Sequence, residues 1–124
     1  MTRCIPFIGV RDIAKTIQWY ESIGFECTGT NHIWEPDCEL NWAELNLQGA
    51  TFMLYPYPFE TNSEIKYAGL YFKLESIDHL IESLEGKAQI IEINEKTFYG
   101  RREIVIRDVN GFQVTFSSEA ATVN

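Results

Sequence analysis

The chain of 124 residues has few of the side chains that support nucleophilic or metal-assisted chemistry. Its only histidines are His32 and His79, and its three cysteines form no CxxC pair. A zinc site or an activated nucleophile needs several such groups at defined spacing. An odd number of unpaired cysteines is also typical of a reducing compartment. We therefore expect two surface histidines and three inert, partly buried thiols, at Cys4, Cys27 and Cys38.

The charge balance limits the classes of partner. Ten basic and eighteen acidic residues give a net charge of −8 at pH 7, which repels nucleic-acid phosphates and anionic membranes. No apolar run approaches the roughly 20 residues that span a bilayer, and the N-terminus lacks the apolar segment of a signal peptide. The sequence therefore predicts a cytoplasmic protein with no nucleic-acid or membrane partner. Its acidic surface serves solubility or attracts a cation.

Hydrophobic periodicity predicts the same order of elements twice. The first set of strands is expected at 4–10, 25–34, 42–47 and 51–55. A helix between the first two would be capped by Asp12 and ended by Gly24. After a Pro-rich linker at 56–64, the second set is expected at 67–74, 88–93, 103–107 and 112–117. Its helix would be capped by Ser76 and ended by Gly86. Reversals are expected at Gln48-Gly49 and Asn110-Gly111.

Regular offsets between the two sets indicate an internal duplication. Ile13 and Ile77 are 64 residues apart, and Gly24 and Gly86 are 62 residues apart. The sequence therefore predicts an α+β fold of two tandem βαβββ modules, at about 4–57 and 66–118, with a tail at 119–124. The modules would form curved mixed sheets around a shared cavity, with one long helix outside each. Residues 1–124 would form a single domain.

This doubled module resembles the vicinal-oxygen-chelate superfamily, which includes glyoxalase I, extradiol dioxygenases, fosfomycin-resistance enzymes and bleomycin resistance proteins. The resemblance covers about residues 4 to 118. Val109 replaces the proline that the superfamily usually has in its last turn. The residues that carry the resemblance are Val10-Arg11-Asp12-Ile13, Trp19-Tyr20, Ile23-Gly24-Phe25, Tyr99-Gly100-Arg101-Arg102-Glu103 and Arg107-Asp108-Val109-Asn110-Gly111.

The resemblance also locates the metal-ligand positions of the superfamily's enzymes. They correspond here to Ile5, Met53, Gly69 and Thr115, none of which is a His, Glu, Asp or Gln. A divalent ion needs several nitrogen, oxygen or sulfur ligands that converge. The resemblance therefore implies a member that holds no metal and no other cofactor.

Bleomycin resistance proteins are the most similar branch. They are small, acidic, dimeric proteins that sequester a cationic glycopeptide in grooves at the dimer interface. Tyr99 stands where they usually have a tryptophan before a glycine, and Trp42 and Tyr71 correspond to aromatic groove positions. Aromatic faces stack on flat heteroaromatic groups, and nearby carboxylates favour a cation. We expect a ligand site lined by Trp42, Glu44, Met53, Tyr55, Tyr71, Tyr99, Glu103 and Thr115.

Two classes of function stay open from the sequence. One is a metal-free protein that binds a bleomycin-like small molecule. The other is a lyase, isomerase or dioxygenase with a non-standard metal or acid/base site, in which Glu44 would be the catalytic carboxylate. The pair Arg101-Arg102 would lie in a loop, as a solvated pair or as a contact for an anionic group. A homodimer is expected because an open concave sheet face leaves apolar surface exposed.

Overall fold

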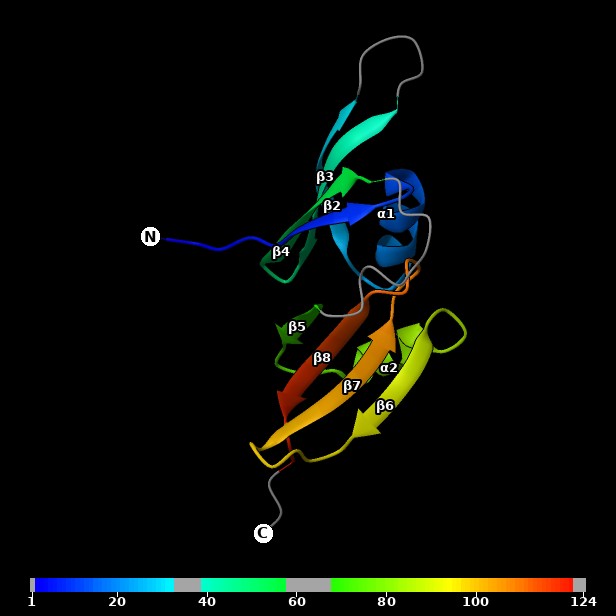
Figure 1. Cartoon of the computed structure of the whole chain (residues 1–124). Helices are drawn as coiled ribbons and strands as arrows, with labels where there is room; N and C mark the ends of the chain where they lie inside the picture. Colours follow the sequence, from blue (N-terminus) through cyan, green and yellow to red (C-terminus); the bar gives the residue numbers. More distant parts are fainter. Residues whose placement is uncertain (1, 33–38, 58–67, 122–124) are drawn as a thin grey trace. The chain divides into compact units, whose positions relative to one another are not determined.

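The computed structural model describes residues 2–32, 39–57 and 68–121 (Figure 1). Cys38 and most of the expected linker at 56–64 therefore lie outside the described residues. The chain divides into two compact units, residues 1–61 and 62–124. Each unit has the order strand, helix, strand, strand, strand, and its strands form one four-stranded mixed sheet. The predicted α+β fold of two βαβββ modules is confirmed.

The first unit places its first and last strands side by side. Strand β1 runs parallel to β4, whereas β2, β3 and β4 are antiparallel neighbours, so the order across the sheet is β1-β4-β3-β2. Parallel strands cannot be joined by a tight turn, so the chain must cross over the sheet between β1 and β4. Helix α1 forms part of this crossover. The elements are β1 (Phe7–Val10), α1 (Ile13–Ser22), β2 (Glu26–His32), β3 (Leu40–Leu47) and β4 (Ala50–Pro56).

Helix α1 forms where the sequence predicts it. The Asp12 side chain accepts a hydrogen bond from the Lys15 backbone N–H at 3.0 Å and caps the first turn. Ile13, Ile17 and Tyr20 are buried along one stripe of the helix. The Tyr20 ring meets Phe52 of the sheet edge-to-face, with ring centroids 5.2 Å apart. This stripe fixes α1 on one face of the first sheet.

The second unit repeats this arrangement, with the sheet order β5-β8-β7-β6 and a parallel pair between β5 and β8. Its core lies between α2 and the sheet, where Ile104, Ile106, Val114 and Phe116 are fully buried. Neither helix of the described residues is long and apolar enough to cross a bilayer. The elements are β5 (Gly69–Lys73), α2 (Asp78–Leu84), β6 (Gln89–Asn94), β7 (Arg101–Arg107) and β8 (Gln113–Glu119).

The helices differ from expectation in length and in one cap. They have 10 and 7 residues, so neither is long. The predicted cap Ser76 is wrong, because α2 begins at Asp78 and Ile77 occupies the cap position. The Ile77 side chain is fully buried, and this anchoring places the helix start one residue later. The Ser76 hydroxyl still accepts a hydrogen bond from the Asp78 N–H at 3.3 Å.

The N-terminal strand is shorter than predicted. It begins at Phe7 rather than at Cys4, and Cys4 is an exposed free thiol rather than a partly buried one. Strand β1 lies at the edge of its sheet, and Pro6 just before it has no N–H to donate to a ladder. The Pro6 carbonyl accepts a hydrogen bond from the Met53 N–H at 2.9 Å, so the pairing with β4 begins at the proline. Cys27 is half-buried, as predicted.

Both predicted reversals occur, with different backbone geometry. Gln48 and Gly49 both have positive φ, 53° and 96°, which suits a tight two-residue hairpin. In the later turn Gly111 has φ of 83°, but Asn110 does not have positive φ. There the Asp108 carboxylate accepts hydrogen bonds from the N–H groups of Asn110 and Phe112 at 2.8 and 2.9 Å. The Asp108 side chain thus stabilises this turn through Asx-type hydrogen bonds, and the expected positive φ at Asn110 is not needed.

Candidate functional site

Each sheet has a second face, opposite its buried row, which we call the open face. Side chains alternate between the two faces of a strand, and the strand register shows which residues share the open face. In the first unit this face carries Phe7, Trp42, Glu44, Met53 and Tyr55. In the second unit it carries Tyr71, Glu103, Val105, Thr115 and Ser117.

The open face of the first unit is aromatic. Trp42 Nε1 donates to Met53 Sδ at 3.3 Å, and the indole lies over Gly29, where a Cβ would be 2.9 Å from the ring. Phe7 and Tyr55 pack edge-to-face with centroids 4.8 Å apart, and Phe7 is 54% exposed. The structure thus pairs the predicted residues Trp42 and Met53, and it pairs Tyr55 with Phe7, which was not predicted.

Glu44 lies on the same face. Its carboxylate Oε1 accepts a hydrogen bond from the Thr28 hydroxyl at 2.7 Å. The partner comes from the neighbouring strand β2, so this bond holds the Glu44 side chain toward the β2 edge of the sheet. The first unit therefore offers a flat apolar surface with one hydrogen-bonded carboxylate beside it.

The open face of the second unit is built around Glu103. This carboxylate is only 9% exposed, and its Oε2 accepts hydrogen bonds from Tyr71 Oη at 2.5 Å and from Tyr99 Oη. In the part of the chain that the structure describes, Glu103 Oε1 has no hydrogen-bond partner and no cation pairs with the carboxylate. Burying a charge is costly unless it is hydrogen-bonded, and here two phenols supply those bonds. Three predicted residues thus form one cluster.

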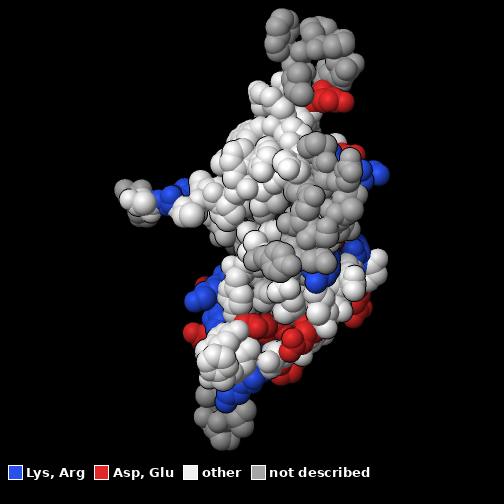
Figure 2. All heavy atoms as spheres, viewed as in Figure 1, with Lys and Arg blue, Asp and Glu red and all other residues white. Residues whose placement is uncertain are grey.

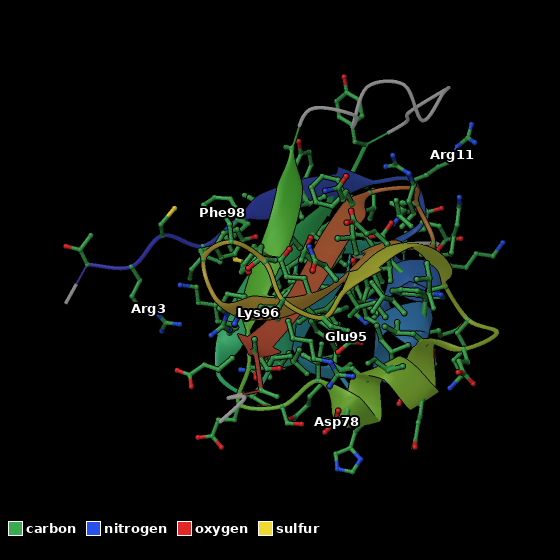
Figure 3. All side chains as sticks on the ribbon, turned by 90° about the horizontal axis from the view of Figure 1, so that it is seen from below. Arg3, Arg11, Asp78, Glu95, Lys96 and Phe98 are labelled. Carbon is green, nitrogen blue, oxygen red and sulfur yellow. The ribbon has the colours of Figure 1, made fainter. Side chains whose placement is uncertain are left out.

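Tyr99 belongs to a turn that several hydrogen bonds hold in place. Thr97 N–H donates to the Arg101 carbonyl at 2.7 Å, and Arg101 N–H donates to the Thr97 hydroxyl at 2.9 Å. Gly100, with φ of 81°, closes the turn. Figure 3 labels the neighbouring Phe98 on this β6–β7 connection, and that ring is 99% exposed. The turn presents the Tyr99 ring in a fixed position, 52% exposed.

The hydrogen bond to Glu103 raises the pKa of Tyr99 to about 12, because the carboxylate would repel a phenolate. We expect absorbance at alkaline pH to show one tyrosine that ionises near pH 12 instead of 10, and Glu103→Gln to return it toward 10. The folded state keeps this proton longer than the unfolded state. The resulting contribution to stability is therefore present below pH 10 and is lost as pH rises toward 12. Normal titration of all tyrosines would contradict the cluster.

The two arginines that were predicted to lie in a loop are the first residues of β7, and both are half-buried. Arg101 Nη2 donates to the buried Ser117 hydroxyl at 2.9 Å. Arg102 lies on the opposite side of the strand, with Nη1 2.5 Å from Asp78 Oδ1 and Nε 2.9 Å from Glu95 Oε2. Figure 3 shows Asp78 at the start of α2 and Glu95 just after β6. The expectation of a solvated loop pair is wrong.

Arg102 also affects its acidic neighbour. The guanidinium holds the pKa of Asp78 below its usual value through a hydrogen bond and charge attraction. A pocket of about 440 Å³ adjoins this pair and includes Ser118 and Lys96. Because Arg102 and Glu103 alternate along the strand, the pocket lies on the other face from the Glu103 cluster. Arg102 therefore links β7 to the start of α2.

The residues at the superfamily's metal positions do not fit a divalent ion. The side chains of Ile5 and Gly69 offer no donor atom, and the Met53 sulfur already accepts a hydrogen bond from Trp42. Thr115 offers one buried hydroxyl. Among the described residues, no three His, Cys, Asp or Glu side chains are grouped as a metal would need. We derive no reaction step through a metal, and the metal-free state stays a prediction.

Equivalent positions of the two open faces carry different chemistry. Phe7 lies beside Met53 in the first unit, and Tyr71 lies beside Thr115 in the second, at the corresponding places of the duplicated sheets. Trp42 corresponds in the same way to Glu103. Figure 2 shows acidic side chains over the sheet of the second unit, whereas the visible described surface of the first unit is mostly uncharged. The 64-residue offset to Tyr71 is the signal that could have identified Phe7.

A model of the Glyoxalase/Bleomycin resistance protein/Dioxygenase superfamily matches residues 4–116. The chain belongs to this superfamily. No curated protein matches it in sequence.

Several solved structures share the superfamily fold along nearly the whole chain. TioX from Micromonospora sp. ML1 has a TM-score of 0.73 at 16% identity and covers 99% of this chain and 100% of its own. A bleomycin resistance determinant encoded on the transposon Tn5 has a TM-score of 0.73 at 13% identity, covering 98% and 100%. A glyoxalase-related enzyme from Clostridium phytofermentans has a TM-score of 0.71 at 19% identity, covering 96% and 95%. At these identities the likeness establishes the fold alone.

Proposed function

We propose that this superfamily member is a metal-free binding protein that sequesters a cationic or aromatic small molecule in a groove at a homodimer interface. The observation that carries the proposal is the Glu103 carboxylate, buried on the open face between Tyr71 and Tyr99. One of its structural relatives is a bleomycin resistance determinant, and a bleomycin-like glycopeptide has the required chemistry.

The Glu103 cluster favours a cation for an electrostatic reason. Both tyrosines donate to Oε2, and this leaves Oε1 as an acceptor for a donor from the ligand. The phenols are neutral, so they satisfy lone pairs without cancelling the negative charge. In a partly desolvated position, a charge-assisted hydrogen bond to a ligand ammonium or guanidinium is about twice as strong as a neutral one. Glu103 therefore supplies the charge selectivity of the proposed site.

The aromatic residues supply the second part of the proposal. Tyr71 and Tyr99 are 45% and 52% exposed, so their ring faces are available although their hydroxyl groups are engaged. The open face of the first unit separately carries Trp42, Met53 and Tyr55, with Glu44 beside them. Stacking on such rings tolerates varied substituents and is worth about 1 kcal/mol per contact beyond buried area. Thr115, 7% exposed, would contribute only its hydroxyl.

Calorimetry with a bleomycin-type glycopeptide tests this function. We expect the wild-type protein to bind with measurable heat and to be stabilised thermally by the ligand. Tyr99→Ala should weaken binding by roughly tenfold because a stacking surface is lost. The matched control is Val109→Ala, which removes an apolar group of similar exposure from a turn outside the cluster. No heat and no thermal shift for wild type at millimolar ligand would reject sequestration of a bleomycin-like molecule and leave the enzyme class or a different ligand.

A further inference from the structure

Arg101 shares the open face of the second unit with Glu103. A single residue separates them in β7, and residues at this spacing point to the same side of a strand. Their Cα atoms are therefore about 6–7 Å apart. The register of the sheet also places Lys73 of β5 on this face, next to Ser117. The open face thus brings positive charge close to the buried carboxylate that the proposed function requires.

A buried hydroxyl holds the Arg101 side chain in place. Nε and Nη2 of Arg101 donate to Ser117 Oγ at 3.3 and 2.9 Å. Ser117 is fully buried, and its own hydroxyl donates to the Phe72 carbonyl at 3.2 Å. A hydroxyl has a single proton to donate, so towards Arg101 the Ser117 oxygen acts as an acceptor. Ser117 therefore fixes one edge of the guanidinium without neutralising its charge.

The charge of Arg101 has no acidic partner in the described part of the chain. No carboxylate there forms an ion pair with it, although Glu103 lies on the same face and Glu119 stands opposite in the ladder. Arg102, the next residue, instead contacts two carboxylates. Lys73 also forms no ion pair with the described residues. The outer edge of the Arg101 guanidinium, formed by Nη1 and the second Nη2 hydrogen, is thus available to an acceptor from a ligand.

This arrangement affects which ligands the Glu103 cluster can select. A molecule with only a cationic group would bring that group towards Glu103 and also towards Arg101 and Lys73, which repel it. An anionic group elsewhere on the same molecule would replace this repulsion with attraction. Arginine binds a carboxylate through two parallel N–H···O bonds, and the outer edge of Arg101 presents such a pair of donors.

We propose that the open face of the second unit prefers a zwitterion, whose ammonium group binds Glu103 and whose carboxylate binds the outer edge of Arg101, with Lys73 beside it. This inference rests on the proposed function, because it narrows the class of ligand for the same site. Arg101 is then a ligand-binding residue, and Ser117 is a positioning residue that acts through it. A flat ring between the two charged groups would suit the exposed rings of the cluster.

Calorimetry with para-aminomethylbenzoate and its methyl ester tests the preference. Both probes have the same ring and ammonium group, but only the first has a carboxylate. We expect the wild-type protein to bind the acid about tenfold more tightly than the ester. Arg101→Gln should remove this preference and should tighten binding of the ester, because a repelling charge is lost. Glu103→Gln should weaken binding of both probes.

Two further variants separate geometry from charge. Arg101→Lys keeps the charge but loses the planar pair of donors, so it should retain only part of the preference for the acid. Arg11→Gln is the matched control, since it removes the same charge from an exposed residue of the first unit. It should leave both affinities unchanged.

Equal affinities of the wild-type protein for the acid and the ester, both dependent on Glu103, would overturn the zwitterion preference and leave the cation-binding function intact. A preference that Arg101→Gln retains would also overturn it. So would the absence of binding of either probe at millimolar concentration, and the glycopeptide measurement then decides the proposed function independently. If Arg101→Gln does not fold, the comparison of probes on the wild-type protein and on Arg101→Lys decides the question.

Discussion

Replacing Phe116 by alanine is expected to destabilise the protein by about 3–5 kcal/mol. The Phe116 ring is fully buried and stacks on Phe72, with centroids 5.5 Å apart and an interplanar angle of 22°. Its removal leaves a cavity between α2 and the sheet that the surrounding backbone can fill only in part. Urea denaturation measures the change in the free energy of unfolding.

Val109→Ala is the control for this experiment. Val109 is 48% exposed in the last turn, so the substitution should change the free energy of unfolding by less than about 0.5 kcal/mol. A loss below about 1 kcal/mol for Phe116→Ala would mean that the second unit tolerates a void at a position where the structure buries the side chain completely.

Glu103→Gln is expected to weaken binding of a cationic glycopeptide by about 10- to 100-fold, the equivalent of one charge-assisted hydrogen bond. Glutamine keeps the size of the side chain and removes its charge. Binding of wild type should also weaken at high salt, although less than for an exposed carboxylate, because Glu103 is 9% exposed. Calorimetry of both proteins at low and high salt gives the two comparisons.

The control for Glu103→Gln is Glu21→Gln on the exposed surface of α1. It changes the net charge by the same amount but lies outside the Glu103 cluster. Equal losses of affinity in the two variants would show a general effect of net charge. That result would contradict the assignment of Glu103 to the site.

The fold could be predicted because the buried residues repeat at regular spacing. Ile13 and Ile17 define one face of α1, and the same spacing recurs 64 residues later. In β8, Val114 and Phe116 are two residues apart, the spacing of one face of a strand, and both are fully buried. The helix start at Asp78 could not be predicted from local sequence, because it depends on the complete burial of Ile77 at the cap position, which only the folded unit determines.

The candidate site was predictable as a set of residue types but not as a set of contacts. Tyr71 and Glu103 are 32 residues apart, and their hydrogen bond depends on the register of β5, β8 and β7. Tyr99 reaches the same oxygen because Gly100 reverses the chain between them. The pairing of Arg102 with Asp78 and Glu95 is likewise a tertiary contact. Sequence periodicity predicts on which face of a helix or strand a residue lies, but it does not predict the residue's hydrogen-bond or ion-pair partners.

The two open faces have an evolutionary consequence. Since neighbouring residues in a strand point to opposite sides, a substitution at Met53 or Thr115 leaves the adjacent core positions Leu54 and Phe116 untouched. After an ancestral module was duplicated, each copy was free to change one surface without losing its ability to fold. The pairs Phe7/Tyr71 and Trp42/Glu103 differ in this way at equivalent positions of the two modules. The repeat thus gave this lineage two separately adjustable surfaces on one inherited architecture.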